Sequence, residues 1–267
     1  MPTLGIIGGG AMGSALLKGL LDKKLFKPEE IFVAEVDNKK RAQLKADYRI
    51  QVTDQPAELA ADCEIIILAV KPNMVAGVLK DIASQVSGNL LVLSIAAGIT
   101  LNFMENQLPT ARFVRVMPNT PARIGQGVSA FALGSNATNN DEESTAAIFG
   151  CVGKVIKVPE YLLDAVTAVS GSGPAYVYYF IEALINAGVM AGLSRGDAAV
   201  LAMETFLGST ALLKETGAEP NQLKNEVTSP GGTTAAALFE LEKGACAGTI
   251  MKAVAAAVQR AKELGAK

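Results

Sequence analysis

Short apolar runs alternate with amphipathic runs from residue 3 to residue 117. The apolar runs carry few polar residues, as strands buried on both faces do, and they predict strands at 3–7, 31–35, 50–52, 65–70, 90–95 and 113–117. The runs between them predict helices at 14–21, 38–47, 56–60 and 74–86. This alternation predicts a doubly wound parallel sheet, an α/β fold of the Rossmann type.

The pattern loosens after residue 125. An extended stretch at 128–133 leads into a polar loop, and a helix at 142–150 and a last strand at 154–158 follow. Pro159 marks the expected boundary between two domains. We therefore predict an α/β domain at 1–158 and a second domain at 159–267.

The second domain is predicted to be all helical. Helices are expected at 161–170, 174–191, 195–215, 220–227, 233–242 and 245–264. Ser194 with Asp197 is a plausible capping box, and Gly217 a plausible stop. Residues 176–181 and 253–258 are apolar on more than one stripe, so these helices must be buried. A domain of this size has little interior for them, and we infer a subunit interface.

The first strand runs into a glycine turn that reads G-x-G-x-x-G at Gly8, Gly10 and Gly13. Glycine allows a tight turn, a pyrophosphate against the backbone, and close packing of helix on sheet. The amides that open the next helix, at Ala11 and Met12, are suited to holding phosphates. A second strand ends 22 residues past Gly13, which completes the context that the motif requires. We therefore predict that the first domain binds a dinucleotide.

The composition excludes several classes of protein. A formal net charge of −2 provides no broad basic surface for nucleic acid. Two charge-free runs, 82–104 and 165–181, contain polar residues, glycine or proline and are interpreted as buried elements rather than membrane spans. The first charged residue is Lys18, so no signal peptide is expected and we predict a cytoplasmic protein.

Two residue types limit the chemistry. Cys63, Cys151 and Cys246 are widely spaced and form no C-x-x-C pair, so we expect small buried hydrophobes in a reducing compartment and no metal site. The chain contains no histidine. The commonest general acid–base is therefore absent from whatever reaction this protein catalyses.

Ligands of open α/β sheets bind at the carboxyl ends of the strands. Ala69, Val70, Lys71 and Pro72 lie at the carboxyl end of the fourth predicted strand. Lys71 is a candidate contact for a cofactor phosphate or ribose, and a solvated lysine before a proline turn explains it equally well.

Two further loops lie at the same predicted edge. Residues 94–98 follow the fifth strand, and the small Ala96 and Ala97 would let a nicotinamide ring lie against the backbone. Residues 117–121 follow the sixth strand, and the amide of Asn119 is suited to orienting the carboxamide or the substrate. A rigid Pro-Asn-Thr-Pro turn is the competing interpretation.

Glu35 bears on the choice of cofactor. An acidic residue at about this distance from the glycine turn usually bonds the ribose 2′-hydroxyl of NAD and repels a 2′-phosphate. Lys39, Lys40 and Arg41 argue for NADPH unless they form the solvated face of a helix. The cofactor is NADPH or NADH, and Glu35 favours NADH.

A second glycine-rich turn opens a helix of the second domain. Residues 227–234 contain no charged side chain but many hydroxyls and exposed amides. Such a turn at a helix N-terminus is suited to an anion such as a carboxylate, and an ordinary capped helix start explains it about as well.

Six segments occur in a fixed order along the chain. They are GGGAMG at 8–13, AVKP at 69–72, SIAAG at 94–98, MPNTP at 117–121, SGSGPAY at 170–176 and EVTSPGGTT at 226–234. Together they resemble the Δ1-pyrroline-5-carboxylate reductases over essentially the whole chain. The TSPGGTT segment is the most specific of them.

The resemblance implies NAD(P)H-dependent reduction of the cyclic imine Δ1-pyrroline-5-carboxylate to L-proline, the last step of proline biosynthesis. It implies that the substrate carboxylate sits on the turn at 229–234, with Ser229, Gly231, Gly232, Thr233 and Thr234 as substrate-binding residues, and that Thr234 hydrogen-bonds the ring nitrogen. It also implies a homodimer through the helical domain, often assembled into rings. Relatives that prefer NADPH tend to have a small hydroxylated residue in place of the glutamate at position 35, which leaves the cofactor preference open.

The missing histidine is compatible with this reaction. Reduction of a ketone creates an alkoxide and normally requires a strong proton donor. An imine can enter the site already protonated, and its reduction gives a basic amine. The site then needs to position the nicotinamide C4 against the imine carbon, with a donor or acceptor near the nitrogen. The hydroxyl of Thr234 would supply that group.

Two alternatives come from other classes. The β-hydroxyacid dehydrogenases share the two-domain layout but carry a catalytic lysine early in the helix after their glycine turn, and residues 174–187 contain no lysine. A non-catalytic NAD(P) sensor would use the helical half as a partner-binding surface and would not turn over a cyclic imine.

Overall fold

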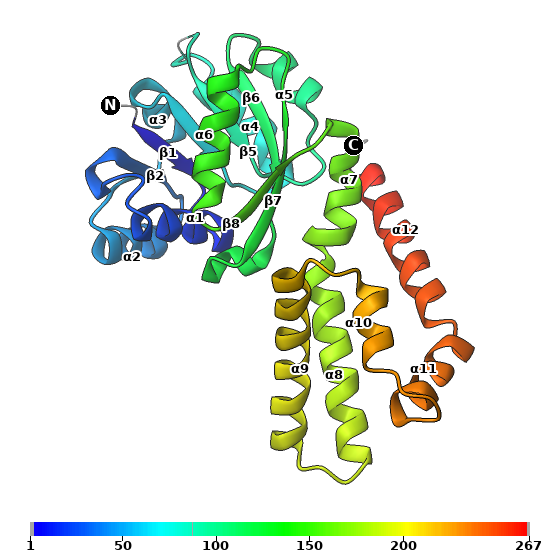
Figure 1. The fold of residues 1–267 in the computed structure, drawn as a ribbon. Coiled ribbons are helices and arrows are strands. Elements are labelled where there is room, and N and C mark those ends of the chain that lie inside the picture. Colours follow the sequence, from blue (N-terminus) through cyan, green and yellow to red (C-terminus); the bar gives the residue numbers. More distant parts are fainter. Residues whose placement is uncertain (1–2, 87, 266–267) are drawn as a thin grey trace. The chain divides into compact units, whose positions relative to one another are not determined.

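The computed structural model describes residues 3–86 and 88–265 of the chain. They fall into two compact units (Figure 1). The sheet unit comprises the residues up to Ser172 together with those from Ala257 onward, and the helical unit comprises Gly173–Ala256.

The sheet unit contains one eight-stranded sheet in the order β3-β2-β1-β4-β5-β6-β7-β8. Its strands are β1 (Leu4–Ile7), β2 (Ile31–Ala34), β3 (Gln51–Thr53), β4 (Ile65–Leu68), β5 (Leu91–Ser94), β6 (Arg112–Met117), β7 (Gly127–Leu133) and β8 (Gly153–Lys157). These lie within a residue or two of the predicted strands. The doubly wound α/β class is confirmed.

One pair of strands departs from the predicted parallel sheet. β6 and β7 run antiparallel, whereas the other neighbouring pairs run parallel. Residues 118–126 are all that connects β6 to β7. A parallel crossover needs a dozen or more residues, so this connection allows only the antiparallel pairing.

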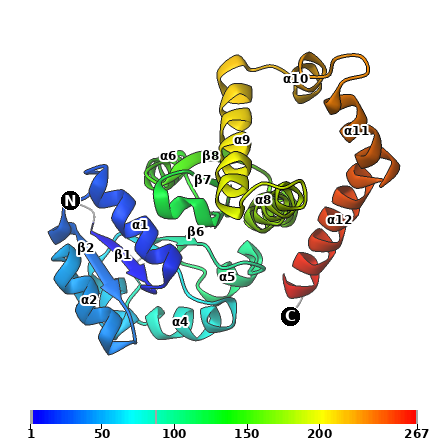
Figure 2. The same ribbon diagram turned by 90° about the horizontal axis from the view of Figure 1, so that it is seen from below.

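Helices cover both faces of the sheet (Figure 2). One face carries α1 (Ala11–Asp22), α2 (Asn38–Tyr48) and α6 (Asn139–Gly150), and the other carries α3 (Pro56–Asp62), α4 (Val75–Ile82), α5 (Leu101–Gln107) and α7 (Leu163–Val166). Leu16, Leu17 and Leu20 of α1 are almost wholly buried. The three leucines lie on the side of α1 that packs against the sheet, as their helical spacing predicts.

Two predicted elements were wrong in extent and one was missed. α4 ends at Ile82 rather than at residue 86, and the helix expected at 161–170 is a 3-10 turn, η4 (Glu160–Leu162), followed by α7 and a π-turn, η5 (Thr167–Gly171). The helix α5 (Leu101–Gln107) was not predicted. Its seven residues follow directly on an apolar strand and loop, so periodicity alone could not separate it from them.

The parallel register brings the strand ends of the site to one level. Ile7, the last residue of β1, pairs with Ala34 of β2 and with Leu68 of β4. The ladder continues into the loops, because Gly8 N–H donates to Ala34 O at 2.8 Å and Ala69 N–H donates to Ile7 O at 2.8 Å. The glycine turn and the Ala-Val-Lys-Pro loop are therefore held side by side.

The sheet unit extends past the expected domain boundary at Pro159. Leu163 and Ala168 are fully buried in it, and Arg115 of β6 forms ion pairs with Glu160 and Asp164. The start of the predicted helical domain is thus tied to the sheet by both apolar and ionic contacts. The assignment of 159–267 as a substrate-binding and dimerisation domain stays a prediction.

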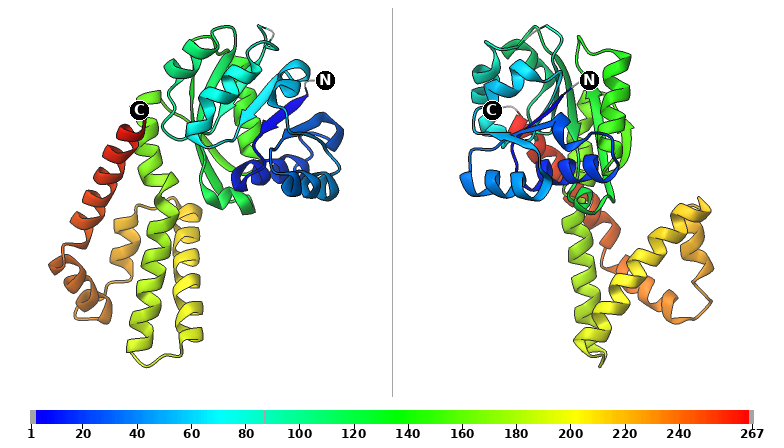
Figure 3. Two further views of the ribbon diagram at one scale, coloured as in Figure 1. Left: turned by 180° about the vertical axis from the view of Figure 1, so that it is seen from behind. Right: turned by 90° about the vertical axis from the view of Figure 1, so that its left-hand side faces the viewer.

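The helical unit contains α8 (Gly173–Met190), α9 (Arg195–Thr216), α10 (Pro220–Glu226), α11 (Thr233–Lys243) and most of α12 (Cys246–Gly265) (Figure 3). Ser194 Oγ accepts from Asp197 N–H at 3.1 Å at the start of α9. Gly217 ends α9 with φ of 64°. Both the predicted start and the predicted stop of this helix are confirmed.

The apolar residues of the helical unit are largely exposed. Tyr179 of α8 is 71% exposed and Leu207 of α9 is 64% exposed. None of the described helices is both long enough and apolar enough to span a membrane.

Two cysteines are buried in the sheet unit, as expected. Burial raises the pKa of the Cys63 thiol to about 12, so the group stays protonated near neutral pH. Cys151 is also buried, and its Sγ lies 3.4 Å from Ala147 O. Both behave as small hydrophobes, whereas Cys246 is partly exposed.

Candidate active site

The glycine turn admits no side chain at two of its three motif positions. A Cβ on Gly13 would lie 2.1 Å from Gly8 O, and a Cβ on Gly8 would lie 2.6 Å from Ala69 O. Gly8 also has φ of 108°, which L side chains rarely adopt. These two glycines are therefore required for the turn itself and for its contact with the neighbouring loop.

Gly10 differs from the other two. It is the N-cap of α1 with an extended backbone (φ −71°, ψ −174°), and no side chain caps the helix there. A Cβ built on Gly10 would meet nothing within 4 Å. Glycine at this position leaves open space in front of the first amides of α1, which is where a phosphate group fits.

Glu35 braces the glycine turn. The residue is 8% exposed, its Oε2 accepts from Gly9 N–H at 2.8 Å, and its Oε1 accepts from Asp37 N–H at 2.9 Å. Both carboxylate oxygens are thus engaged by backbone amides. Glu35 shapes the turn in addition to any contact with a cofactor.

Arg41 secures the connection between β2 and α2. Its guanidinium donates to Glu35 O at 2.6 Å and lies 3.4 Å from the carboxylate of Asp54. The Asp37 carboxylate accepts from Lys39 N–H at 2.8 Å and caps α2. Hydrogen bonds from the Lys40 and Lys39 amides lower the pKa of Asp37 below its ordinary value, so this cap is charged near neutral pH.

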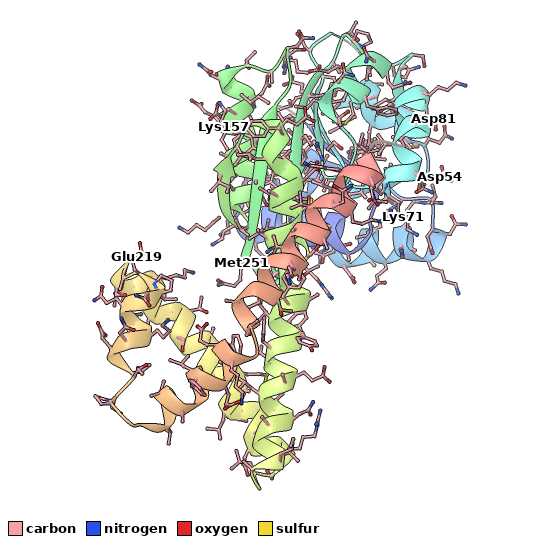
Figure 4. The ribbon with its side chains drawn as sticks, turned by 90° about the vertical axis from the view of Figure 1, so that its right-hand side faces the viewer. Asp54, Lys71, Asp81, Lys157, Glu219 and Met251 are labelled. Carbon is pink, nitrogen blue, oxygen red and sulfur yellow. The ribbon has the colours of Figure 1, made fainter. Side chains whose placement is uncertain are left out.

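A cavity of about 210 Å³ lies at the carboxyl ends of β1, β2 and β4. The predicted cofactor residues that line it are Gly8, Gly10, Glu35, Ala69, Val70 and Lys71. Asp54 and Lys71, two of its lining residues, are labelled in Figure 4. Its walls, a glycine turn, a carboxylate and apolar side chains, fit the adenosine half of a dinucleotide.

Other predicted cofactor residues lie outside this cavity. Ala11 lines a second cavity of about 300 Å³ with Gly10 and Lys40. Met12 is partly buried in α1, and Pro72 opens the short 3-10 turn η2 (Pro72–Met74). Ala96 is buried and Ala97 is exposed in the loop after β5. The contact of these residues with a cofactor stays a prediction.

Asn119 is engaged within the sheet unit. Its Oδ1 accepts from Val128 N–H at 2.9 Å, and its Nδ2 donates to Ser170 O at 3.3 Å. The amide therefore holds the start of β7 and the π-turn in place. A contact with the carboxamide or the substrate would use its remaining hydrogen-bonding capacity and stays a prediction.

The cavity is also lined by residues that were not predicted as cofactor contacts. They are Ile7, Ala34, Val36, Asp54, Pro56, Met74 and Val78. Val36 is 69% exposed although it is apolar. Val36 and Asp54 each follow closely on a strand, so the rule that ligands bind at the carboxyl ends of strands would have found them.

The second glycine-rich turn has the geometry expected of an anion site. Gly231 has φ of 69°, and Gly232 is the N-cap of α11 without a side-chain cap. Gly232 N–H donates to Ser229 O at 3.0 Å, which closes the turn. The backbone N–H groups of Thr233 and Thr234, the first two residues of α11, have no acceptor within their own helix.

The fold and the glycine turn together define a dinucleotide-binding protein of the Rossmann class. Residues 3–98 match the family model described as NADP oxidoreductase, coenzyme F420-dependent. Residues 160–264 match the model described as pyrroline-5-carboxylate reductase dimerisation.

Full-length comparisons are more specific. The chain is 46% identical to a pyrroline-5-carboxylate reductase of Synechocystis over 99% of this chain and 98% of that protein. It is also similar to the crystal structure of a Plasmodium falciparum pyrroline carboxylate reductase with NADP bound, at 36% identity and a TM-score of 0.89 over 99% and 98% of the two chains. A Coxiella burnetii pyrroline-5-carboxylate reductase structure is similar at 35% identity and a TM-score of 0.91, with 98% of each chain covered. The chain belongs to the pyrroline-5-carboxylate reductase family.

Gly10→Ala tests whether phosphates approach this turn. We expect the variant to fold with an unchanged thermal midpoint, because its Cβ meets no protein atom within 4 Å. NAD(P)H affinity should fall by roughly tenfold or more, about 1.4 kcal/mol, because the methyl group occupies the space in front of the α1 amides. Isothermal titration with both cofactors measures this.

Gly150→Ala is the matched control, since a Cβ on Gly150 also meets nothing within 4 Å and lies in α6. It should bind the cofactors as the unmodified chain does. Unchanged affinity in Gly10→Ala would show that phosphates do not approach the turn there.

Proposed function

We propose that this chain catalyses the NAD(P)H-dependent reduction of Δ1-pyrroline-5-carboxylate to L-proline, the final step of proline biosynthesis. The observation that carries the proposal is the 46% identity to a pyrroline-5-carboxylate reductase over 99% of the chain. That match includes both the cavity beside the glycine turn and the turn that opens α11. The comparisons do not favour a β-hydroxyacid dehydrogenase or a non-catalytic sensor.

The substrate carboxylate is assigned to the turn at Ser229, Gly231, Gly232 and Thr233. This turn supports the assignment because its helix has no side-chain cap and its first amides are free of intrahelical partners. Amides at the positive end of a helix favour an anion. Thr234, the second residue of α11, is assigned to the ring nitrogen.

The reaction fits a chain without histidine. The bound reduced nicotinamide supplies a hydride to the carbon of the C=N bond. The ring nitrogen becomes an amine that is basic enough to keep its proton, so the protein needs to orient the imine rather than supply a strong acid. A hydroxyl at Thr234 orients the nitrogen by hydrogen bonding in either direction.

The cofactor is NADH or NADPH, with NADH favoured by Glu35. The Glu35 carboxylate lines the cavity and would repel a 2′-phosphate. Arg41 is engaged by Glu35 O and by Asp54, which limits its use as a phosphate ligand. NADP in the Plasmodium falciparum structure and the NADP family model support NADPH as the second cofactor.

The helical region is assigned to a homodimer, with assembly of dimers into a ring as a further proposal. The family model for dimerisation over residues 160–264 supports the dimer. The exposed apolar side chains of α8 and α9, such as Tyr179 and Leu207, need a partner surface to leave water. A cytoplasmic location stays a prediction.

An assay at 340 nm tests the reaction. NADH and NADPH oxidation is followed separately with pyrroline-5-carboxylate and with pyrroline-2-carboxylate as the control imine. We expect rapid oxidation with the first imine only. Cofactor binding without turnover would leave the dinucleotide site intact and would contradict the proposed reaction.

Thr234→Ala tests the assignment of the ring nitrogen. The variant loses the hydroxyl, and we expect kcat/KM for pyrroline-5-carboxylate to fall roughly 10- to 100-fold, about 1.4–2.7 kcal/mol of transition-state stabilisation. Thr234→Ser keeps the hydroxyl and should stay within a few-fold of the unmodified enzyme. Thr216→Ala removes a hydroxyl that donates to Leu212 O on α9 and should have no effect. An unchanged kcat/KM in Thr234→Ala would remove this residue from the site.

Glu35→Ser tests the basis of cofactor preference. Removing the carboxylate should shift the ratio of kcat/KM for NADPH over NADH upward by roughly tenfold, because a negative charge in the wall of the cavity is lost. Glu35→Gln removes the charge but keeps an oxygen that can accept from Gly9 N–H. It therefore distinguishes the effect of the charge from the effect of the hydrogen bond to the glycine turn. If both variants keep the original cofactor ratio, Glu35 acts on the turn alone.

A further inference from the structure

Arg115 is a buried charge in the middle of the sheet. It lies on β6, where it pairs with Ser94 of β5 and with Ala132 of β7. Its side chain is 8% exposed. A buried guanidinium is stable only with charged or hydrogen-bonding partners, so the groups around Arg115 are constrained by it.

Two carboxylates surround Arg115, and both come from the start of the region that matches the dimerisation model. Arg115 Nη1 lies 3.2 Å from Glu160 Oε1, and Arg115 Nη2 lies 3.5 Å from Asp164 Oδ1. Glu160 belongs to η4 and Asp164 to α7. The guanidinium thus fixes where the chain leaves β8 and enters the helical region.

Glu160 makes one more contact, at the end of the loop that follows β5. Its Oε1 accepts from Leu101 N–H at 2.7 Å. Leu101 is the first residue of α5, whose N-cap Thr100 accepts from Phe103 N–H at 3.2 Å. One orphan amide of α5 is therefore capped locally, and another is capped by a residue 59 positions away.

The cap fixes one end of the loop that carries Ala96 and Ala97. The other end is held by the sheet ladder, because Ile95 N–H donates to Leu68 O at 3.1 Å. Within the loop, Gly98 has φ of 79° and approaches Gly265 of α12 so closely that a Cβ on Gly265 would lie 2.8 Å from Gly98 O. The loop is thus held by hydrogen bonds at both ends, and the end of α12 lies close to its middle.

We propose that Glu160 is a positioning residue for hydride transfer: held by Arg115, it caps α5 at Leu101 and so sets the loop at 95–100 against which the nicotinamide lies. The proposal rests on the proposed function, since it assigns this loop to the nicotinamide. A hydride moves only over a short, well-aligned distance, and a displacement of about 1 Å can cost about 100-fold in rate. The start of the dimerisation region would in this way control the alignment of the cofactor.

Glu160→Ala is the central variant. We expect kcat for pyrroline-5-carboxylate reduction to fall roughly tenfold while KM for the imine changes less than about twofold, because the loop and not the imine site is released. The primary isotope effect on kcat with 4-deuterated cofactor should rise, as hydride transfer becomes rate-limiting. Amide exchange of Leu101 should accelerate, because its hydrogen bond to Glu160 is lost.

Two further variants separate positioning from stability. Glu160→Gln keeps an oxygen that can accept from both Leu101 N–H and Arg115 Nη1, so it should restore kcat and slow amide exchange. Asp164→Ala removes the other carboxylate of Arg115 and should lower the thermal midpoint while kcat and Leu101 exchange stay unchanged. All variants are assayed well below their thermal midpoints.

Three outcomes overturn the proposal. They are an unchanged kcat in Glu160→Ala, a loss in Asp164→Ala equal to that in Glu160→Ala, and a Glu160→Gln variant as slow as Glu160→Ala. If the unmodified chain does not reduce pyrroline-5-carboxylate, the proposed function fails. Leu101 exchange in the same variants then shows separately whether Glu160 holds the loop.

Discussion

The structure of the sheet unit depends on how closely its backbone segments approach one another at the glycine turn. Gly8 and Gly13 leave no room for a side chain, because the nearest backbone oxygens would lie within 2.6 Å of a Cβ. This approach packs the start of α1 against β1 and the loop after β4. It also places Gly8 and Gly10 in the wall of the cavity that Glu35 and Lys71 line. A dinucleotide site is the direct consequence of that contact.

Charged groups in the sheet unit are used to hold loops in place. Both carboxylate oxygens of Glu35 accept hydrogen bonds from backbone amides, one in the glycine turn and one in the connection to α2. Glu160 holds the first amide of α5, and Arg115 holds Glu160. The bonds from Gly9 to Glu35 and from Leu101 to Glu160 join segments far apart in the sequence, and each holds a loop on the carboxyl side of the sheet. The protein thus orders its ligand-binding edge with buried, charge-assisted hydrogen bonds, which are stronger than neutral ones.

The absence of histidine and the geometry of the two glycine-rich turns are both compatible with the reduction of a protonated imine. An imine that is already protonated needs alignment more than it needs acid, and in the proposed site the uncapped start of α11 would offer amides to its carboxylate. The helical unit presents apolar side chains on α8 and α9 that the unit itself does not cover. Family membership in the pyrroline-5-carboxylate reductases accounts for both features, since the matched helical model is one of dimerisation.

The sequence by itself determined the α/β fold, the strands and most helices, and the residues of the glycine turn, because periodicity and glycine spacing are local signals. It also identified the family through segments such as EVTSPGGTT at 226–234. The antiparallel pairing of β7 with β6 was not predicted, although the short connection at 118–126 implies it. Only the tertiary structure showed that Glu35 and Asn119 hydrogen-bond to distant backbone groups and that Glu160 caps α5. Those facts depend on contacts between residues far apart along the chain, and no local pattern of hydrophobic and polar positions encodes which distant amide a carboxylate will meet.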